Sequence, residues 1–213
     1  MESTSYWLLF FSAAFAINIS PGPDMIYILS KTIAEGRKIG IATSIGVWSG
    51  ALVHVLAAAL GLSAILATSA ITFSVVKYVG AAYLVYLGIQ ALRSKGETFD
   101  IATNRGAQIT AWKALRQGAL VDILNPKAAI FFMAFLPQFV RPELGHNSAQ
   151  IFMLGVLVIV VAIPVELFVV LTADRTTNYF RKNRRFSIWL DRVSGSVLIG
   201  LGLRLALAEN NNA

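Results

Sequence analysis

Hydrophobic residues cluster into six runs that are separated by short polar stretches. A helix needs about 20 predominantly apolar residues to cross a hydrocarbon core of about 30 Å, and each of these runs reaches roughly that length. The predicted spans are approximately Trp7–Leu29, Ile39–Ala67, Ile71–Leu92, Gln117–Phe139, Ile151–Ala173 and Ile188–Leu207. The pattern therefore predicts an all-α polytopic membrane protein, with residues 1–213 forming one integral membrane domain.

Two of the predicted spans are interrupted by proline. Residues 18–24, Asn-Ile-Ser-Pro-Gly-Pro-Asp, break the first span, and Asn125-Pro126 breaks the fourth. Proline lacks a backbone donor and clashes with the preceding turn, so a continuous helix does not persist there. Irregular backbone at membrane depth survives only where protein buries it or where it lines a cavity. Because transporters hold substrates and coupling ions at such breaks, the two motifs predict a binding site.

The two halves of the chain resemble each other. Ser20–Pro23 in the first span corresponds to Asn125–Lys127 in the fourth, and Leu87–Ile89 in the third corresponds to Leu201–Leu203 in the sixth. We predict pseudo-repeats over about 5–93 and 116–208, joined by a cytoplasmic loop over about 94–115. Each half has three spans, so the second repeat must be inverted relative to the first.

The basic residues predict the orientation of the chain. Fourteen of the 18 lysines and arginines follow span one, join spans three and four, precede span six or lie at its start. Lys77, Arg141 and Arg204 lie on the opposite side, and Lys127 lies inside span four. Positive charge marks the cytoplasmic side, so both termini are predicted to lie outside.

The amino-acid composition excludes several classes of protein and of function. The chain is 56% hydrophobic and 14% charged, whereas soluble domains carry about 25% charged residues. The net charge of +7 fits anchoring at membrane lipid, and we predict no nucleic-acid partner. The absence of cysteine excludes disulfides and thiolate metal sites. Without a nucleophile–base pair, phosphate loop or metal spacing, we predict no enzyme activity, cofactor or bound metal.

Ionisable side chains inside the spans are candidates for function because their burial is costly. Asp24 follows the first break, where a carboxylate binds a substrate ammonium, takes a proton or caps the next half-helix. Asp122 lies one turn before Pro126 and faces the second break. Glu166 is either a third proton-binding carboxylate or a partner of Arg175 or Arg192.

Other candidates are basic or neutral. Lys127 either meets a substrate carboxylate or forms a structural pair with Asp122 or Asp24. His54 is either a proton relay or a hydrogen-bonded packing residue. Together, the candidate substrate-binding or proton-coupling residues are Asn18, Ser20, Pro21, Gly22, Pro23, Asp24, His54, Asp122, Asn125, Pro126, Lys127 and Glu166.

Small and aromatic residues predict a helix–helix contact and anchors at the membrane interface. Ala42, Gly46 and Gly50 recur every four residues and predict a close helix–helix contact within the chain, with a dimer interface as the alternative. Trp7, Trp48, Trp112 and Trp189 are interpreted as anchors at the membrane interface.

The motifs together resemble the LysE/RhtB family of bacterial amino-acid exporters, the homoserine/threonine-type efflux proteins. The resemblance depends on residues 18–24, Gly46–Gly50, Gly80–Gly88 and the Asp-Ile-Leu-Asn-Pro-Lys-Ala-Ala-Ile-Phe-Phe stretch at 122–132. It covers essentially the whole chain. It implies six spans, inverted three-helix repeats, homodimers and proton-driven export of amino acids.

The combined hypothesis is a secondary transporter that exports small neutral amino acids or close derivatives by proton antiport. The homoserine, threonine and leucine class is the expected substrate group. Export of basic amino acids or of a divalent metal ion is the alternative, although Lys127 among the carboxylates disfavours a metal ion.

Overall fold

The computed structural model describes residues 4–20, 22–68, 70–93, 109–173 and 184–207. These residues form helices and no strand, which confirms the all-α prediction. The elements are α1 (Thr4–Ile19), α2 (Pro23–Glu35), α3 (Arg37–Thr68), α4 (Ala70–Arg93), α5 (Ala111–Ile123), α6 (Pro126–Phe135), the 3-10 turns η1 (Leu136–Phe139) and η2 (Pro142–Leu144), α7 (Asn147–Leu171) and α9 (Arg184–Leu207).

Helix breaks occur at both proline motifs, as predicted. Gly22 is extended and caps α2, whose first residue is Pro23. Proline suits that position because the first helical N–H has no partner within the helix. Asn125 caps α6 with its side chain, which accepts a hydrogen bond from the Lys127 N–H at 3.0 Å. The segment Pro126–Phe139 is bent by 57° relative to α5.

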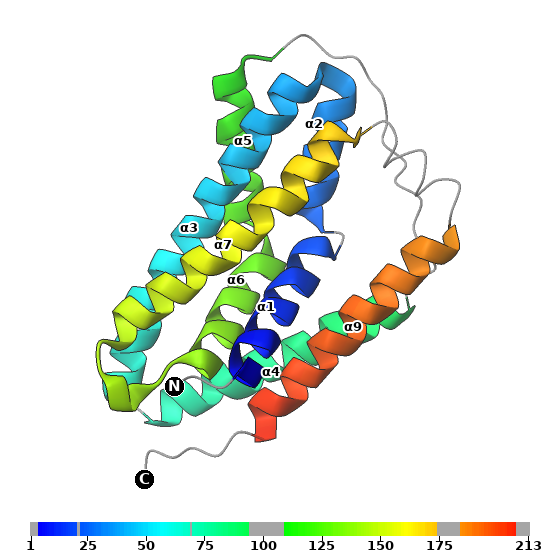
Figure 1. The fold of residues 1–213 in the computed structure, drawn as a ribbon. Coiled ribbons are helices and arrows are strands. Elements are labelled where there is room, and N and C mark those ends of the chain that lie inside the picture. Colours follow the sequence, from blue (N-terminus) through cyan, green and yellow to red (C-terminus); the bar gives the residue numbers. More distant parts are fainter. Residues whose placement is uncertain (1–3, 21, 69, 94–108, 174–183, 208–213) are drawn as a thin grey trace.

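The helices form two packed groups (Figure 1). Helix α3 packs against α2, α5 and α7, whereas α4 packs mainly against α9. The start of α1 and the end of α9 lie at one end of the molecule. The turn between α2 and α3 and the starts of α5 and α9 lie at the opposite end. Arg37, Lys38 and Lys113 therefore gather at the end opposite to Thr4 and Leu207.

Helices α3 and α5 approach closely because glycine lines their contact. A Cβ at Gly46 would overlap the backbone of Leu115, and a Cβ at Gly118 would overlap the Thr43 carbonyl. Gly50 similarly lies against Ala119 and Asp122. The small-residue series thus packs within one chain, as predicted, and it brings the end of α5 against the middle of α3.

Aromatic side chains fix α1 against α6 and η1. The rings of Phe131 and Phe135 stack with centroids 4.5 Å apart, and Phe10 meets Phe139 at 5.2 Å. The Tyr6 hydroxyl donates to the Phe139 carbonyl at 2.6 Å. This cluster holds the helix that leads into the first break.

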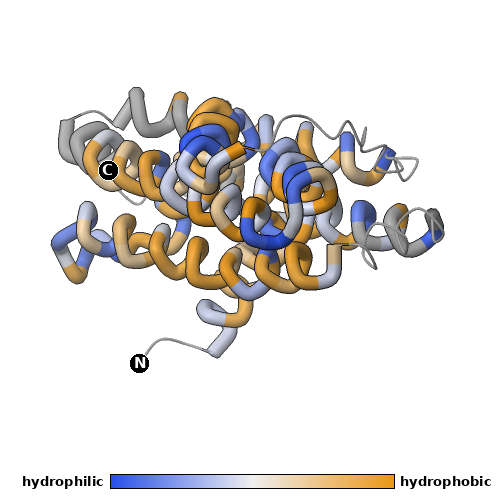
Figure 2. The backbone as a smooth tube through the Cα atoms, turned by 90° about the horizontal axis from the view of Figure 1, so that it is seen from above, coloured by the Kyte–Doolittle hydropathy of each residue, from blue (hydrophilic) through white to orange (hydrophobic). Residues whose placement is uncertain are grey.

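Hydrophobic residues predominate along most of the helices (Figure 2), and many large ones are exposed. Leu8, Leu60 and Phe168 are among the large apolar residues that are exposed. A soluble monomer rarely exposes so many large apolar residues. Such an exterior suits contact with lipid.

Length and hydropathy identify two described helical segments that can cross a membrane, Arg37–Gly61 and Asn147–Leu171. The bent pair of α5 and Pro126–Phe139 adds a third, whereas α1 is shorter. The six-span count and the inverted repeat therefore stay predictions.

The helix that carries the start of the fourth predicted span is longer than that span. Helix α5 begins at Ala111 rather than at Gln117, because the Thr110 side chain accepts a hydrogen bond from the Lys113 N–H and caps the helix. The end of the predicted loop is thus helical. Residues 94–108 of that loop lie outside the described residues.

Candidate functional site

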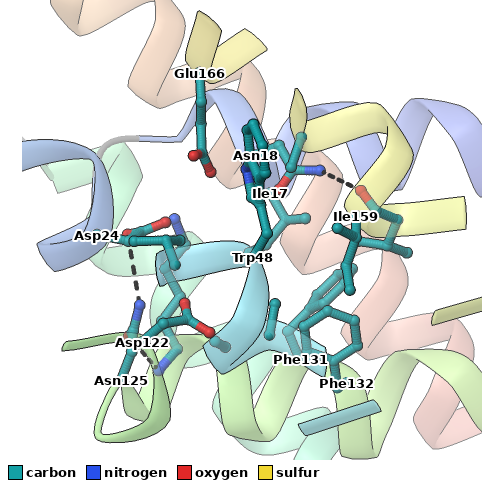
Figure 3. Close-up of a pocket in the computed structure, with 16 residues that line it drawn as sticks. Ile17, Asn18, Asp24, Trp48, Asp122, Asn125, Phe131, Phe132, Ile159 and Glu166 are labelled. Carbon is teal, nitrogen blue, oxygen red and sulfur yellow. Dashed lines mark hydrogen bonds between the residues drawn. The ribbon is translucent and has the colours of Figure 1, made fainter. Parts of the chain in front are cut away.

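Both helix breaks open onto one cavity (Figure 3). The ends of α1 and α5, the starts of α2 and α6, and the middle parts of α3 and α7 surround it. Six of the predicted site residues line this cavity: Asn18, Asp24, Asp122, Asn125, Lys127 and Glu166.

Asp122 is buried on the last turn of α5 and is 3% exposed. Within the part of the chain that the structure describes, its Oδ2 has no hydrogen-bond partner. An unpartnered buried carboxylate oxygen is costly. Asp122 therefore offers an acceptor that a bound cationic group or a proton would satisfy.

Asp24 lies in the first turn of α2, where the helix dipole favours a negative charge. The prediction that it caps the helix is wrong, because Gly22 occupies the cap position. Asn125 Nδ2 donates to Asp24 Oδ1 at 3.5 Å, a long hydrogen bond. This contact joins the first break to the second.

Lys127 reaches from the second break back to the first. Its Nζ donates to the Ser20 carbonyl at 2.7 Å, at the end of α1, where helical carbonyls lack partners. No ion pair between described residues joins Lys127 to Asp24 or Asp122. The alternative of a structural lysine–aspartate pair therefore finds no support in this geometry.

Glu166 extends from α7 into the cavity between Asp24 and Trp48 (Figure 3). It is 5% exposed, and its Oε2 finds no hydrogen-bond partner among the residues described. The predicted alternative of pairing with Arg192 is wrong, since Arg192 is exposed on α9 and Glu166 is buried on α7. Arg175 lies outside the described residues.

Apolar side chains form the opposite wall of the cavity. Phe131 and Phe132 come from α6, and Val158 and Ile159 come from α7. Figure 3 shows Phe131, Phe132 and Ile159 on one side and Asp24, Asp122 and Asn125 on the other. The site thus separates charged groups from a hydrophobic surface.

Comparison with known proteins assigns the family. A sequence model described as LysE type translocator matches residues 15–209. The chain belongs to the LysE type translocator family. This confirms the resemblance that the motifs carry and agrees with transport rather than enzymatic turnover.

Similar proteins are known from distant bacteria. An uncharacterized membrane protein of Pseudomonas aeruginosa is 30% identical over 208 residues, which span 96% of this chain and 96% of that protein. An uncharacterized membrane protein of Vibrio cholerae is 29% identical over 203 residues, which span 95% of this chain and 97% of that protein. The uncharacterized membrane protein YrhP of Bacillus subtilis is 30% identical over 197 residues, 89% of this chain and 93% of its own. No solved structure matches the chain.

In this LysE-type translocator, His54 lies beside the cavity rather than on its wall. Its Nε2 donates to the Asp122 carbonyl at 2.9 Å, and its ring stacks on Phe132 with centroids 6.3 Å apart. These contacts support the interpretation of a hydrogen-bonded packing histidine, which holds the end of α5 in place.

The remaining predicted residues shape the breaks. Asn18 Nδ2 donates to the carbonyls of Ala14 at 2.8 Å and Val158 at 3.2 Å, which fixes α1 to α7. Pro23 and Pro126 begin α2 and α6 and are exposed. Ser20 is buried, and Pro21 lies outside the described residues.

The interpretation of Trp48 as an interfacial anchor is wrong, because its indole lines the cavity. The position of Trp48 in the sequence already argues against an interfacial anchor. Trp48 lies nine residues inside the predicted span, about 14 Å along a helix, which is too deep for an interface. Trp112 and Trp189 are exposed near the starts of α5 and α9, as an anchor requires.

Within the described residues, no three histidine, aspartate or glutamate side chains are arranged to hold a metal ion. The candidate ligands of the cavity are three carboxylates, two amides and one ammonium group. This donor set can bind a molecule that carries both a positive and a negative group.

Proposed function

We propose that this LysE-type translocator exports small neutral amino acids or close derivatives across the bacterial inner membrane by proton antiport. The homoserine, threonine and leucine class is the proposed substrate group. The observation that carries the proposal is the cavity itself, which places one ammonium group, several carboxylates and an apolar wall around one space.

A zwitterionic amino acid complements this arrangement. The Lys127 ammonium, at the positive end of the α6 dipole, would hold the substrate carboxylate. Asp24 or Asp122 would accept hydrogen bonds from the substrate ammonium. The substrate side chain would then face Phe131 and Phe132, where a second charge would lose its hydration without gaining a partner. The apolar wall therefore favours a substrate whose side chain is neutral.

The size of the cavity indicates that the site must open to load. The volume that the centre of a water molecule can occupy is about 40 Å³. One water needs roughly 10–15 Å³ by that measure, so the cavity holds about three waters. An amino acid has more heavy atoms than this, so binding requires α2, α5 or α6 to move. Alternating access supplies such a movement.

The proposed architecture has six spans in two inverted three-helix repeats, with both termini periplasmic. Packing of α4 on α9 supports it, because these helices occupy matching places in the two halves. Gly88 and Gly195 meet reciprocally at their contact, each facing the other's carbonyl. We also propose the homodimer that the family resemblance implies.

Proton binding to a cavity carboxylate would couple transport to the gradient. Adding a proton removes one buried negative charge and so changes the relative free energies of the inward-open and outward-open states. Three carboxylates line the cavity, Asp24, Asp122 and Glu166. The exchange of a proton for a substrate then requires only that one of them titrates between the two states.

Substitution of the two aspartates tests the proposal. In proteoliposomes, Asp24→Asn and Asp122→Asn should each reduce gradient-driven efflux of neutral amino acids about tenfold or more, because each removes a charged acceptor. Glu143→Gln, at an exposed site in η2, is the matched control and should transport normally. Intact proton-coupled transport in both aspartate variants would contradict the proposed mechanism.

A further inference from the structure

A second polar cluster lies on the α3–α7 side of the cavity. Ser44 and Trp48 are one turn apart on the same face of α3, and Glu166 faces them from α7. Helices α3 and α7 pack against each other, and Figure 3 shows the Trp48 indole and the Glu166 carboxylate in the same cavity. The sequence did not identify Ser44 or Trp48 as functional residues.

Each member of this cluster has an unsatisfied polar atom. Ser44 Oγ, Trp48 Nε1 and Glu166 Oε2 are all buried and lack a hydrogen-bond partner within the described ranges. Ser44 is fully buried. Burying three such atoms together is costly unless a change of state satisfies them. The hydroxyl and the indole N–H are donors, and an ionised carboxylate is the acceptor that matches them.

The charges around Glu166 come from three other elements. Asp24 faces it from the start of α2, Asp122 from the end of α5 and Lys127 from the start of α6, while α1 contributes the neutral Asn18. With all carboxylates ionised, the cavity holds three negative groups against one positive group. Closing an empty cavity around that excess charge is unfavourable.

We infer that Glu166 binds the coupled proton, and that Ser44 and Trp48 are positioning residues that donate hydrogen bonds to its carboxylate after the proton leaves. This inference rests on the proposed function. Asp122 and Lys127 remain available for the substrate's two charged ends. The proton forms an O–H bond with Glu166 Oε2 from the periplasmic side, and that bond breaks on the cytoplasmic side. The empty carrier then closes and returns only when Glu166 is protonated.

The Glu166→Gln variant tests the site of the proton. Glutamine mimics the protonated side chain, so the empty carrier returns at any pH. In proteoliposomes, Glu166→Gln should retain exchange of labelled for unlabelled amino acid and lose stimulation by a pH gradient. Gradient-driven transport in Glu166→Gln would overturn the inference. Loss of exchange in a correctly inserted variant would also overturn it, because Glu166 would then be needed for the substrate.

Assays of the wild-type protein distinguish a failure of the proposed function from a failure of the assigned proton site. If wild-type protein exchanges no amino acid in the same assay, the proposed function fails irrespective of Glu166. If wild-type transport responds to the gradient and Glu166→Gln responds equally, the function stands and only the proton site is wrong.

Conservative variants test the two donors. Ser44→Ala and Trp48→Phe each remove one donor to the ionised carboxylate, so half-maximal gradient-driven efflux should move to higher pH by about one unit. Ser49→Ala and Trp112→Phe, at exposed positions on α3 and α5, are matched controls and should leave the pH profile unchanged. A merely structural role would lower the rate without moving the profile. An unshifted profile in both donor variants would overturn their assignment.

Discussion

Lys127 carries its ammonium group at a place where its own helix disfavours a cation. It is the second residue of α6, and the positive end of the helix dipole lies there. The hydrogen bond from Nζ to the Ser20 carbonyl, at the negative end of α1, offsets part of this cost. A cation held between two helix ends and lacking an ion pair among the described residues suits the capture of an anionic group.

Replacement of Lys127 tests whether it recognises the substrate carboxylate. Hydrogen bonds to charged groups contribute about 1.5–3 kcal/mol, so Lys127→Gln should raise the KM for efflux by roughly tenfold or more. Lys113→Gln, exposed at the start of α5, is the control and should leave the KM unchanged. The KM is measured in proteoliposomes loaded with increasing substrate concentrations. An unchanged KM in Lys127→Gln would show that another group holds the carboxylate.

Individual site residues differ in how well the sequence predicts them. Asp122 and Glu166 are recognisable because a carboxylate in an apolar run is rare, and the structure buries both in one cavity. Ser44 and Trp48 are not recognisable from the sequence, because small hydroxyl and aromatic residues are ordinary in a membrane span. Their orientation depends on the rotation of α3, which the glycine contact with α5 fixes.

At the scale of elements, α2 and α5 are joined at the end of the molecule that carries the basic residues. Glu35 Oε2 accepts a hydrogen bond from the Ile109 N–H at 2.9 Å, just before α5. The Tyr27 hydroxyl donates to Gln117 Oε1 at 2.9 Å. Helices α2 and α5 belong to the two different broken pairs. These bonds therefore couple any movement of one pair to the other.

Glu35 makes this connection dependent on pH. It lies beyond the predicted first span, and Lys31 pairs with it at 2.9 Å. Burial opposes its ionisation, but the Ile109 N–H and the Lys31 ammonium together lower the pKa of Glu35 below its usual value. The stability that ionised Glu35 adds to the folded protein is fully present above the pKa of about 4.3 that a glutamate has in the unfolded chain. This contribution is lost as the pH falls through the lower pKa of Glu35 in the folded protein.

The Glu35→Gln variant tests this connection. It should lower the free energy of unfolding in detergent by about 1 kcal/mol at pH 7, because one charge-assisted hydrogen bond is lost. The difference from wild type should shrink as the pH falls through the folded pKa of Glu35. Thermal unfolding across a pH series measures both, with the exposed Glu143→Gln as control. A difference that does not depend on pH would contradict the role of Glu35 ionisation.

Element boundaries show where local sequence is sufficient. Pro23 and Pro126 mark the starts of α2 and α6, because proline suits the first helical position and interrupts what precedes it. The start of α5 was missed because Ala111–Arg116 contains polar residues that hydropathy assigns to a loop. The Thr110 cap is what starts the helix there.

At the scale of the whole molecule, the sequence predicts the helical class, the order of the helices and the end at which basic residues gather. It predicts a binding site at the two helix breaks but not the apolar wall of the cavity, because hydrophobic side chains face both lipid and core in a membrane protein. Phe168 is exposed and Phe131 is buried, although both lie in strongly apolar segments. Only the packing of α1, α3, α6 and α7 distinguishes them.

The most direct test of the central claim is efflux from proteoliposomes that contain wild-type protein and a panel of labelled amino acids. We predict that small neutral amino acids leave faster when the external medium is more acidic than the lumen. Collapsing the pH gradient should abolish that difference, because the inward movement of protons drives the exchange. If no amino acid leaves faster than from protein-free vesicles, or if the gradient has no effect, proton-coupled amino-acid export is contradicted.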